Sequence, residues 1–178
     1  MREIEESAPT GRSHTISLLV ENKPGVLHRI AGLFSRRGFN IASLTVGPTE
    51  RPEYSRMTIV VLLQSKSVEQ VVRQVQKLVP VVEVRELSPN DLVERELMLV
   101  KITTPERNHT ELRALAETYE ANVVDVSPDA LIVEASGNAG KLDALEERLR
   151  PFGIQELCRS GRIALERGFK TLAPPSLK

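Results

Sequence analysis

The feature that most constrains this fold is an order of strands and helices that occurs twice along the chain. Residues 14–21 are rich in β-branched and aliphatic side chains, which predicts a strand. Residues 24–37 carry apolar side chains at i, i+3, i+4 and i+7, the spacing of one helical face, namely Leu27, Ile30, Ala31 and Phe34. Further strands are predicted at residues 40–46, 56–64 and 81–87, and a second helix at 68–79. The order predicted for the first half is strand, helix, strand, strand, helix, strand.

The second half repeats this order without repeating the residues. Strands are predicted at residues 97–103, 122–126, 131–135 and 154–158, and helices at 110–120 and 141–149. The polar segment 88–96 (SPNDLVERE) has the turn-forming content of a linker. Each half then forms a split βαβ unit, with a four-stranded antiparallel sheet and both helices on one face. The sequence predicts an α+β fold of two ferredoxin-like βαββαβ domains in tandem.

The strands contain continuous apolar runs, such as TIVVLL at residues 58–63 and LMLVKI at 97–102. A sheet buried on one face predicts alternation of apolar and polar residues instead. The second face of each sheet therefore needs a cover. Dimerisation is the simplest way to supply it.

Composition excludes several classes of protein. Lys+Arg and Asp+Glu both total 24, so the formal net charge is zero, which disfavours nucleic acid as a partner. A single cysteine, Cys158, cannot form an internal disulfide or a cysteine-based metal site. No apolar run approaches the roughly 20 residues that span a bilayer, and the charged N-terminus lacks the apolar core of a signal peptide. We expect a soluble cytoplasmic protein.

The chain offers no recognisable catalytic constellation. Its three histidines, His14, His28 and His109, are scattered and lack metal-ligand spacing. The segment GNAGKL at residues 137–142 lacks the first glycine and the hydroxyl residue of a phosphate-binding loop, and is better explained as a turn that opens a helix. We therefore expect no catalytic residue and no metal site.

The join between the first strand and the first helix is the strongest candidate for a ligand site. Residues 20–41 read VENKPGVLHRIAGLFSRRGFNI, so Asn22 and Gly25 bracket the turn and Asn40 follows the helix. The helix is predicted to begin at Pro24 or Gly25, because proline suits the first helical position. Asparagine amides can bind both an ammonium and a carboxylate.

The start of a helix also favours an anion. The N–H groups of Gly25, Val26 and Leu27 would point outward at the positive end of the helix dipole, and glycine would let a ligand approach the backbone. The residues suit a small anion or an amino acid. They equally suit an ordinary helix start, and these residues alone leave both interpretations open.

Five segments of the chain resemble one family. They are SLLVENKPGVLHRIAGLFSRRGFNIASLTV (17–46), SRMTIVV (55–61), VERELMLVKI (93–102), GKLDAL (140–145) and RSGRIALERG (159–168). Together they resemble the regulatory small subunit of acetohydroxyacid synthase, also called acetolactate synthase, with its N-terminal ACT domain. The first segment alone would indicate only some ACT domain, a common amino-acid sensor. The resemblance covers about residues 14–169.

The resemblance implies a regulatory function. In that family the small subunit has no catalytic activity; it activates a catalytic subunit that depends on thiamine diphosphate, and it confers feedback inhibition by valine or related branched-chain amino acids. Thiamine diphosphate, Mg and FAD are expected on the catalytic large subunit, with no cofactor in this chain. The effector is expected between two ACT domains of a homodimer, in contact with Asn22, Gly25, Val26, Leu27, Asn40 and Ile41.

The resemblance and the repeat together predict the domain boundaries. Residues 14–88 form the ACT domain and residues 93–170 a second ferredoxin-like domain. Residues 1–13, a charged extension, and residues 171–178, a Pro-rich tail, are expected to be disordered.

Two other classes of function were weighed. A stand-alone ACT sensor could control another enzyme or a transcription factor, and co-purification of a thiamine-dependent synthase would distinguish it. An RNA-recognition domain also has a split βαβ fold, but it places aromatic residues on the sheet. This chain has four Phe, two Tyr and no Trp, which disfavours that class.

Overall fold

The computed structural model describes residues 12–63, 67–103 and 108–174. The chain divides into two compact units. The first contains Met1–Val93 together with Arg162–Lys178, and the second contains Glu94–Gly161. The chain thus returns to the first unit at Arg162, whereas the sequence predicted a second domain that extends to residue 170.

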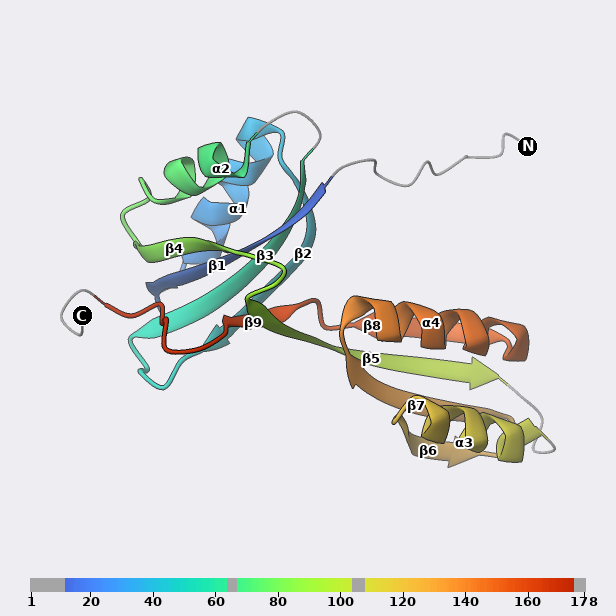
Figure 1. Cartoon of the computed structure of the whole chain (residues 1–178). Helices are drawn as coiled ribbons and strands as arrows, with labels where there is room; N and C mark the ends of the chain where they lie inside the picture. Colours follow the sequence, from blue (N-terminus) through green and yellow to red (C-terminus); the bar gives the residue numbers. More distant parts are fainter. Residues whose placement is uncertain (1–11, 64–66, 104–107, 175–178) are drawn as a thin grey trace, which may run out of the picture. The chain divides into compact units, whose positions relative to one another are not determined.

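The first unit is built on a four-stranded antiparallel sheet with the strand order β2-β3-β1-β4. Helices α1 and α2 cover one of its faces (Figure 1). Its elements are β1 (Arg12–Glu21), α1 (Val26–Arg37), β2 (Asn40–Pro48), β3 (Tyr54–Leu63), α2 (Val68–Val75) and β4 (Val81–Leu87). The predicted order and the ferredoxin-like fold are confirmed for this unit.

The second unit repeats the topology, with the strand order β6-β7-β5-β8. Its elements are β5 (Leu92–Thr103), α3 (His109–Thr118), β6 (Asn122–Ser127), β7 (Ala130–Gly137), α4 (Ala139–Leu149), the short 3-10 helix η2 (Arg150–Phe152) and β8 (Ile154–Arg159). β5 begins inside the segment predicted as a linker. A further strand, β9 (Ile163–Glu166), pairs with β5 and was not predicted.

The core of the first unit lies between the sheet and the two helices. β1 contributes Ile16, Leu18 and Val20, which are fully buried. The core face of α1 is formed by Val26, Ile30, Leu33 and Phe34. The core face of α1 differs from the face predicted from the sequence by a rotation about the helix axis. Leu27, predicted to be in the core, is 44% exposed, and Leu33, which was not predicted, is buried. Leu27 is therefore free to contact something other than the core.

The second face of this sheet is covered by the chain itself. Residues 162–174, here called the strap, lie across it (red in Figure 1). Ala164, Leu172 and Pro174 of the strap are buried, as are Ser17 and Leu19, which point away from the helices. The first four residues of the predicted disordered tail, 171–174, thus pack on the sheet, and residues 175–178 lie outside the described residues. Within the described residues, the strap supplies the cover that was predicted for the second face of this sheet, and no second chain is needed for it.

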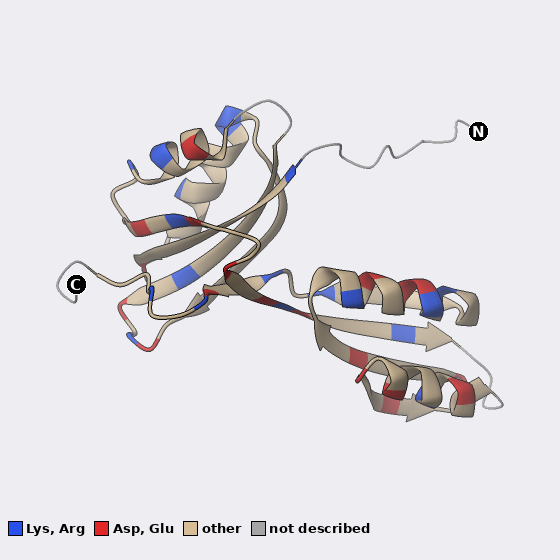
Figure 2. Ribbon diagram, in the orientation of Figure 1, with Lys and Arg blue, Asp and Glu red and all other residues tan. Residues whose placement is uncertain are grey.

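The remaining sequence predictions concern location and charge. Among the helices that the structure describes, none is long and apolar enough to cross a membrane. Lys and Arg are interspersed with Asp and Glu in both units (Figure 2).

Candidate effector site

The segment before α1 is a tight turn. Gly25 has φ 83° and ψ −7°, and Val26 N–H donates to Lys23 O at 3.4 Å. These angles belong to the third residue of a type II turn, which favours Pro-Gly at its centre because the glycine has a positive φ. α1 accordingly begins at Val26, so the predicted helix start at Pro24 or Gly25 was one or two residues too early.

The turn offers donors and open space. Within the described part of the chain, the N–H groups of Gly25 and Leu27 have no backbone acceptor, and the first turn of α1 carries no acidic residue. A Cβ at Gly25 would meet no heavy atom within 4 Å. Leu27 is exposed beside these donors, whereas Val26 is buried. A carboxylate would be attracted to the helix start, and an aliphatic side chain to Leu27.

Asn22 has a structural role in this turn. Its Nδ2 donates to Pro52 O at 2.9 Å, and its backbone N–H donates to Glu53 O at 2.7 Å. Asn22 thereby ties the end of β1 to the loop between β2 and β3. The amide remains exposed, so its oxygen and second N–H can still face a ligand.

Asn40 and Ile41 lie at the other end of the sheet. Asn40 pairs with Leu62, which pairs with Ser13 near the start of β1. Glu21, next to Asn22, pairs instead with Tyr54. Leu62 and Tyr54 are eight residues apart on β3, a distance of about 27 Å along a strand. One chain therefore does not bring the two predicted halves of the site together.

Comparison with known proteins identifies the family. A family model described as the AHAS small subunit-like ACT domain matches residues 16–83, and one described as the small subunit of acetolactate synthase matches residues 95–168. A protein of Archaeoglobus fulgidus, named probable acetolactate synthase small subunit, is 50% identical over 157 residues, which cover 88% of this chain and 98% of that protein. The chain belongs to the acetolactate synthase small-subunit family.

Other relatives agree with this identification. The acetolactate synthase small subunit of Mycobacterium bovis is 49% identical over 88% of this chain and 94% of its own length. The crystal structure of the acetolactate synthase small subunit from Thermotoga maritima has a TM-score of 0.82 at 39% identity, and the match covers 89% of this chain and 99% of that one. The resemblance that the sequence motifs indicated is confirmed over both domains.

The strap is a structured segment of the first unit that the sequence did not predict. Arg85 binds Glu166 of the strap at 2.6 Å and Glu83 at 2.8 Å, and Glu83 Oε2 accepts the Ala173 N–H at 3.2 Å. The hydrogen bond that Arg85 donates to Glu166 raises the pKa of Arg85 and lowers the pKa of Glu166. This ion-pair cluster fastens the middle and the end of the strap to β4.

Arg56 of β3 holds a further point of the strap. Its guanidinium donates to Ser17 Oγ and to Leu172 O, both at 3.3 Å. Burial lowers the pKa of Arg56, against the attraction of Glu50 and Glu83. A pocket of about 190 Å³ beside this guanidinium is lined in part by Lys170. The only sequence signal for this packing was the family motif RSGRIALERG, because β9 is four residues long and a Pro-rich tail usually indicates disorder.

Proposed function

We propose that this chain is the regulatory subunit of an acetolactate synthase. It has no catalytic activity of its own, activates the catalytic large subunit, and confers feedback inhibition by valine or a related branched-chain amino acid. Family membership over both domains supports the regulatory role. Thiamine diphosphate, Mg and FAD belong to the catalytic subunit in this proposal, so the isolated chain does not condense pyruvate to acetolactate.

The effector site is completed by a second copy of the chain. The observation that carries this step is the separation of Asn22 and Gly25 from Asn40 and Ile41 by the length of the sheet. β2 is an edge strand, so two copies can pair their β2 strands in antiparallel fashion.

Such pairing, centred on Leu44, would place Asn40 of one copy opposite Pro48 of the other. Pro48 pairs with Ser55, and Ser55 pairs with Val20 near the turn. Each of two equivalent sites would then combine the turn of one copy with Asn40 and Ile41 of the other. The dimer proposed here uses the β2 edge, because the strap covers the second sheet face of the first unit.

The test is substitution of Gly25 by two residues of equal size. Both Gly25→Asp and Gly25→Asn place a side chain in the open space of the turn, and both residue types tolerate a positive φ. Only aspartate repels the effector carboxylate. Losing one charge-assisted hydrogen bond costs about 1.5–3 kcal/mol, so valine affinity should fall roughly 10- to 100-fold more for Gly25→Asp than for Gly25→Asn.

The measurement is calorimetric titration of each variant with valine, leucine and isoleucine, followed by valine inhibition of the reconstituted synthase. Asn40→Ala should weaken binding more mildly, because it removes contacts without adding repulsion. Equal affinity of the two Gly25 variants would place the carboxylate elsewhere. Failure of the wild-type chain to co-purify with, or to activate, a thiamine-dependent synthase would contradict the regulatory role itself.

A further inference from the structure

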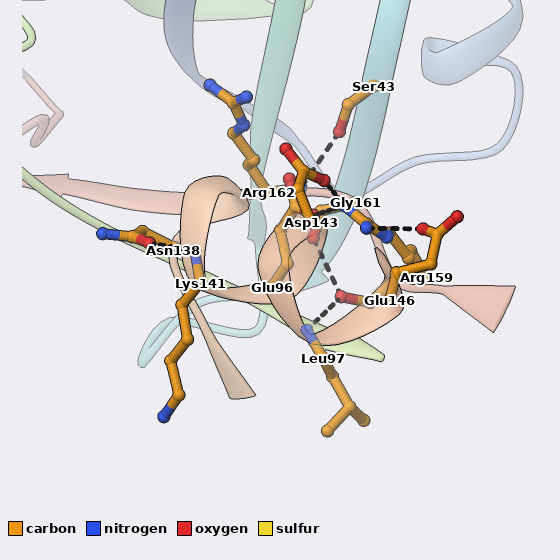
Figure 3. A network of polar contacts seen from close by, with 11 residues as sticks. Ser43, Glu96, Leu97, Asn138, Lys141, Asp143, Glu146, Arg159, Gly161 and Arg162 are labelled. Atoms are coloured by element: carbon orange, nitrogen blue, oxygen red, sulfur yellow. Dashed lines mark hydrogen bonds and ion pairs between the residues drawn. The ribbon is translucent and has the colours of Figure 1, made fainter. Parts of the chain in front are cut away.

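The chain passes from the second unit to the first through a very short crossover, Arg159–Arg162. Hydrogen bonds and ion pairs hold its N-terminal end, Arg159 and Ser160, to the second unit. Arg159 binds Asp143 at 2.7 Å and Glu146 at 2.9 Å (Figure 3). Ser160 exchanges two hydrogen bonds with Leu97, because its N–H donates to Leu97 O at 2.9 Å and its Oγ accepts the Leu97 N–H at 3.0 Å. Residues 159 and 160 are thereby anchored to α4 and β5.

The other end of the crossover is fixed to β2. The Arg162 N–H donates to Ser43 Oγ at 3.0 Å, and Thr45 Oγ1 donates to Arg162 O at 2.6 Å (Ser43 and Arg162 in Figure 3). Ser43 and Thr45 are two residues apart and so face the same side of the strand. We call this pair of hydroxyls the clamp. It holds both backbone polar groups of the first strap residue.

Few residues separate the two anchored ends. Between Arg159 and Arg162 there are only Ser160 and Gly161, and three residues of chain span at most about 10 Å. Gly161 has φ 79° and already adopts a left-handed conformation. Because only Gly161 separates the anchored residues Ser160 and Arg162, the crossover is a short covalent path from the clamp to Ser160 and Arg159.

A β-bulge lies between the clamp and the proposed effector residues. Ile41 pairs with Val61 and Ser43 with Val60, so Ala42 is an extra residue in β2. A bulge is a local change of register, and moving it along a strand turns the residues it passes to the opposite face. The bulge is thus a point at which the register of β2 can change, with Asn40 and Ile41 before it and the clamp after it.

We propose that the clamp couples effector binding to the second unit: an amino acid held by Asn40 and Ile41 changes the bulge, and Ser43 and Thr45 pass the change to the crossover through Arg162. This inference rests on the proposed effector site, and it adds the route by which the bound effector acts on the rest of the chain. The effector favours whichever arrangement of β2 binds it better. Ser43 and Thr45 are coupling residues and do not touch the ligand.

The test separates effector binding from its consequence. Ser43→Ala with Thr45→Val removes both hydroxyls at nearly constant volume. The control, Ser127→Ala with Thr118→Val, removes two hydroxyls that donate to backbone oxygens within the second unit, far along the chain from the crossover. Ser43→Thr with Thr45→Ser restores both hydroxyls and should behave like the wild type.

The clamp variant should bind valine within about threefold of the wild-type affinity by calorimetry. In the reconstituted synthase it should still activate the catalytic subunit, while the valine concentration for half inhibition rises at least fivefold, the lower end of typical coupling between sites. Normal inhibition of the clamp variant would overturn the proposal. Loss of valine binding that the restoring variant repairs would overturn it too, because the hydroxyls would then act on the pocket. A wild-type chain that binds no branched-chain amino acid would instead refute the effector site.

A second measurement does not need the catalytic subunit. Valine should change the hydrogen-exchange protection of residues 154–166 in the full wild-type chain and in the control, but not in the clamp variant. An equal change in all three proteins would contradict the proposal. If the double variant folds poorly, Ser43→Ala and Thr45→Val are made separately, and the effect of valine on hydrogen exchange in each is compared with the wild type.

Discussion

β1 and β5 occupy equivalent places, each between two antiparallel neighbours in a sheet of the same strand order. Their exposure differs along the strand. Residues 15–20 of β1 are all buried, whereas along β5 the exposed Leu97 and Leu99 alternate with the buried Met98 and Val100. Continuous burial requires a cover on both faces, and alternation requires only one. The strap supplies the second cover of β1.

The comparison shows that the same topology can be completed in two ways. Leu19 pairs with Arg56 and Glu83, and all three outward positions lie under or beside the strap. Leu99 pairs with Glu134 and Cys158, and Cys158 is exposed. The strap therefore makes the first unit depend on residues more than a hundred positions away, while the second unit is closed by its own helices.

The largest expected effect is the difference between Leu19→Ala and Leu99→Ala. Leu19 is 3% exposed and Leu99 is 39% exposed, so only the first substitution leaves a cavity. Leu19→Ala should lower the free energy of unfolding by about 2–4 kcal/mol. Leu99→Ala should change it by less than about 1 kcal/mol. Denaturant unfolding of both variants measures the difference.

Each variant has its own contradictory outcome. An equally small effect of Leu19→Ala would mean that the strap does not seal the sheet. An equally large effect of Leu99→Ala would mean that the outer face of β5 is covered in the folded protein, for instance by another chain.

The element order was predictable because it depends on local patterning. The periodicity of α1 and the β-branched composition of β3 are properties of adjacent residues, and ten of the predicted strands and helices lie within a few residues of their observed positions. Two predictions differ most from the observed elements. α2 ends at Val75, before the predicted residue 79, and β5 begins inside the predicted linker.

The strap was not predictable from the same rules. Ile163, Ala164 and Leu165 form a short apolar run before Glu166, and four residues are too few to distinguish a strand from a loop. The ion-pair partner of Glu166 is Arg85, 81 positions away. The apolar run at residues 58–63 of β3 indicated that a second cover existed, yet the run itself does not say whether another chain or the same chain provides it.

The candidate site was predictable in its residue types and not in its arrangement. The Pro-Gly dipeptide indicates a turn with a positive φ at Gly25, and the family motif indicates Asn40 and Ile41. The separation of these two parts follows from strand register, which pairing with β3 sets. A single sequence does not contain that register in readable form, so it did not show that Asn22 and Gly25 lie the length of the sheet away from Asn40 and Ile41 in one chain.

A smaller effect is expected from the arginines that hold carboxylates in each unit. Arg85 contacts Glu83 and Glu166 in the first unit, and Arg159 contacts Asp143, Glu146 and Glu96 in the second. Two carboxylates in each set are largely buried, but only the first set holds the strap. Arg85→Met should cost about 1–3 kcal/mol and loosen the strap, because it leaves buried carboxylates without that partner. Arg159→Met should destabilise the protein by a similar amount without loosening the strap. Unfolding and hydrogen exchange of residues 163–173 measure both, and greater strap exchange in the Arg159 variant would contradict the assignment.

The smallest expected effect is a pH dependence that belongs to the strap. The hydrogen bond that Glu166 accepts from Arg85 holds the pKa of Glu166 below the ordinary value of about 4.3. A carboxyl group whose pKa is lower in the folded state stabilises the fold above its unfolded pKa, and the stabilisation is lost as pH falls through the folded pKa. The difference in unfolding free energy between the wild type and Glu166→Gln should therefore be constant near pH 6–7 and shrink below about pH 4.3. Leu99→Ala, which leaves the strap intact, should keep the wild-type pH profile. A difference between wild type and Glu166→Gln that persists unchanged to pH 3 would mean that the ion pair does not hold the strap, and the two units would then differ by packing alone.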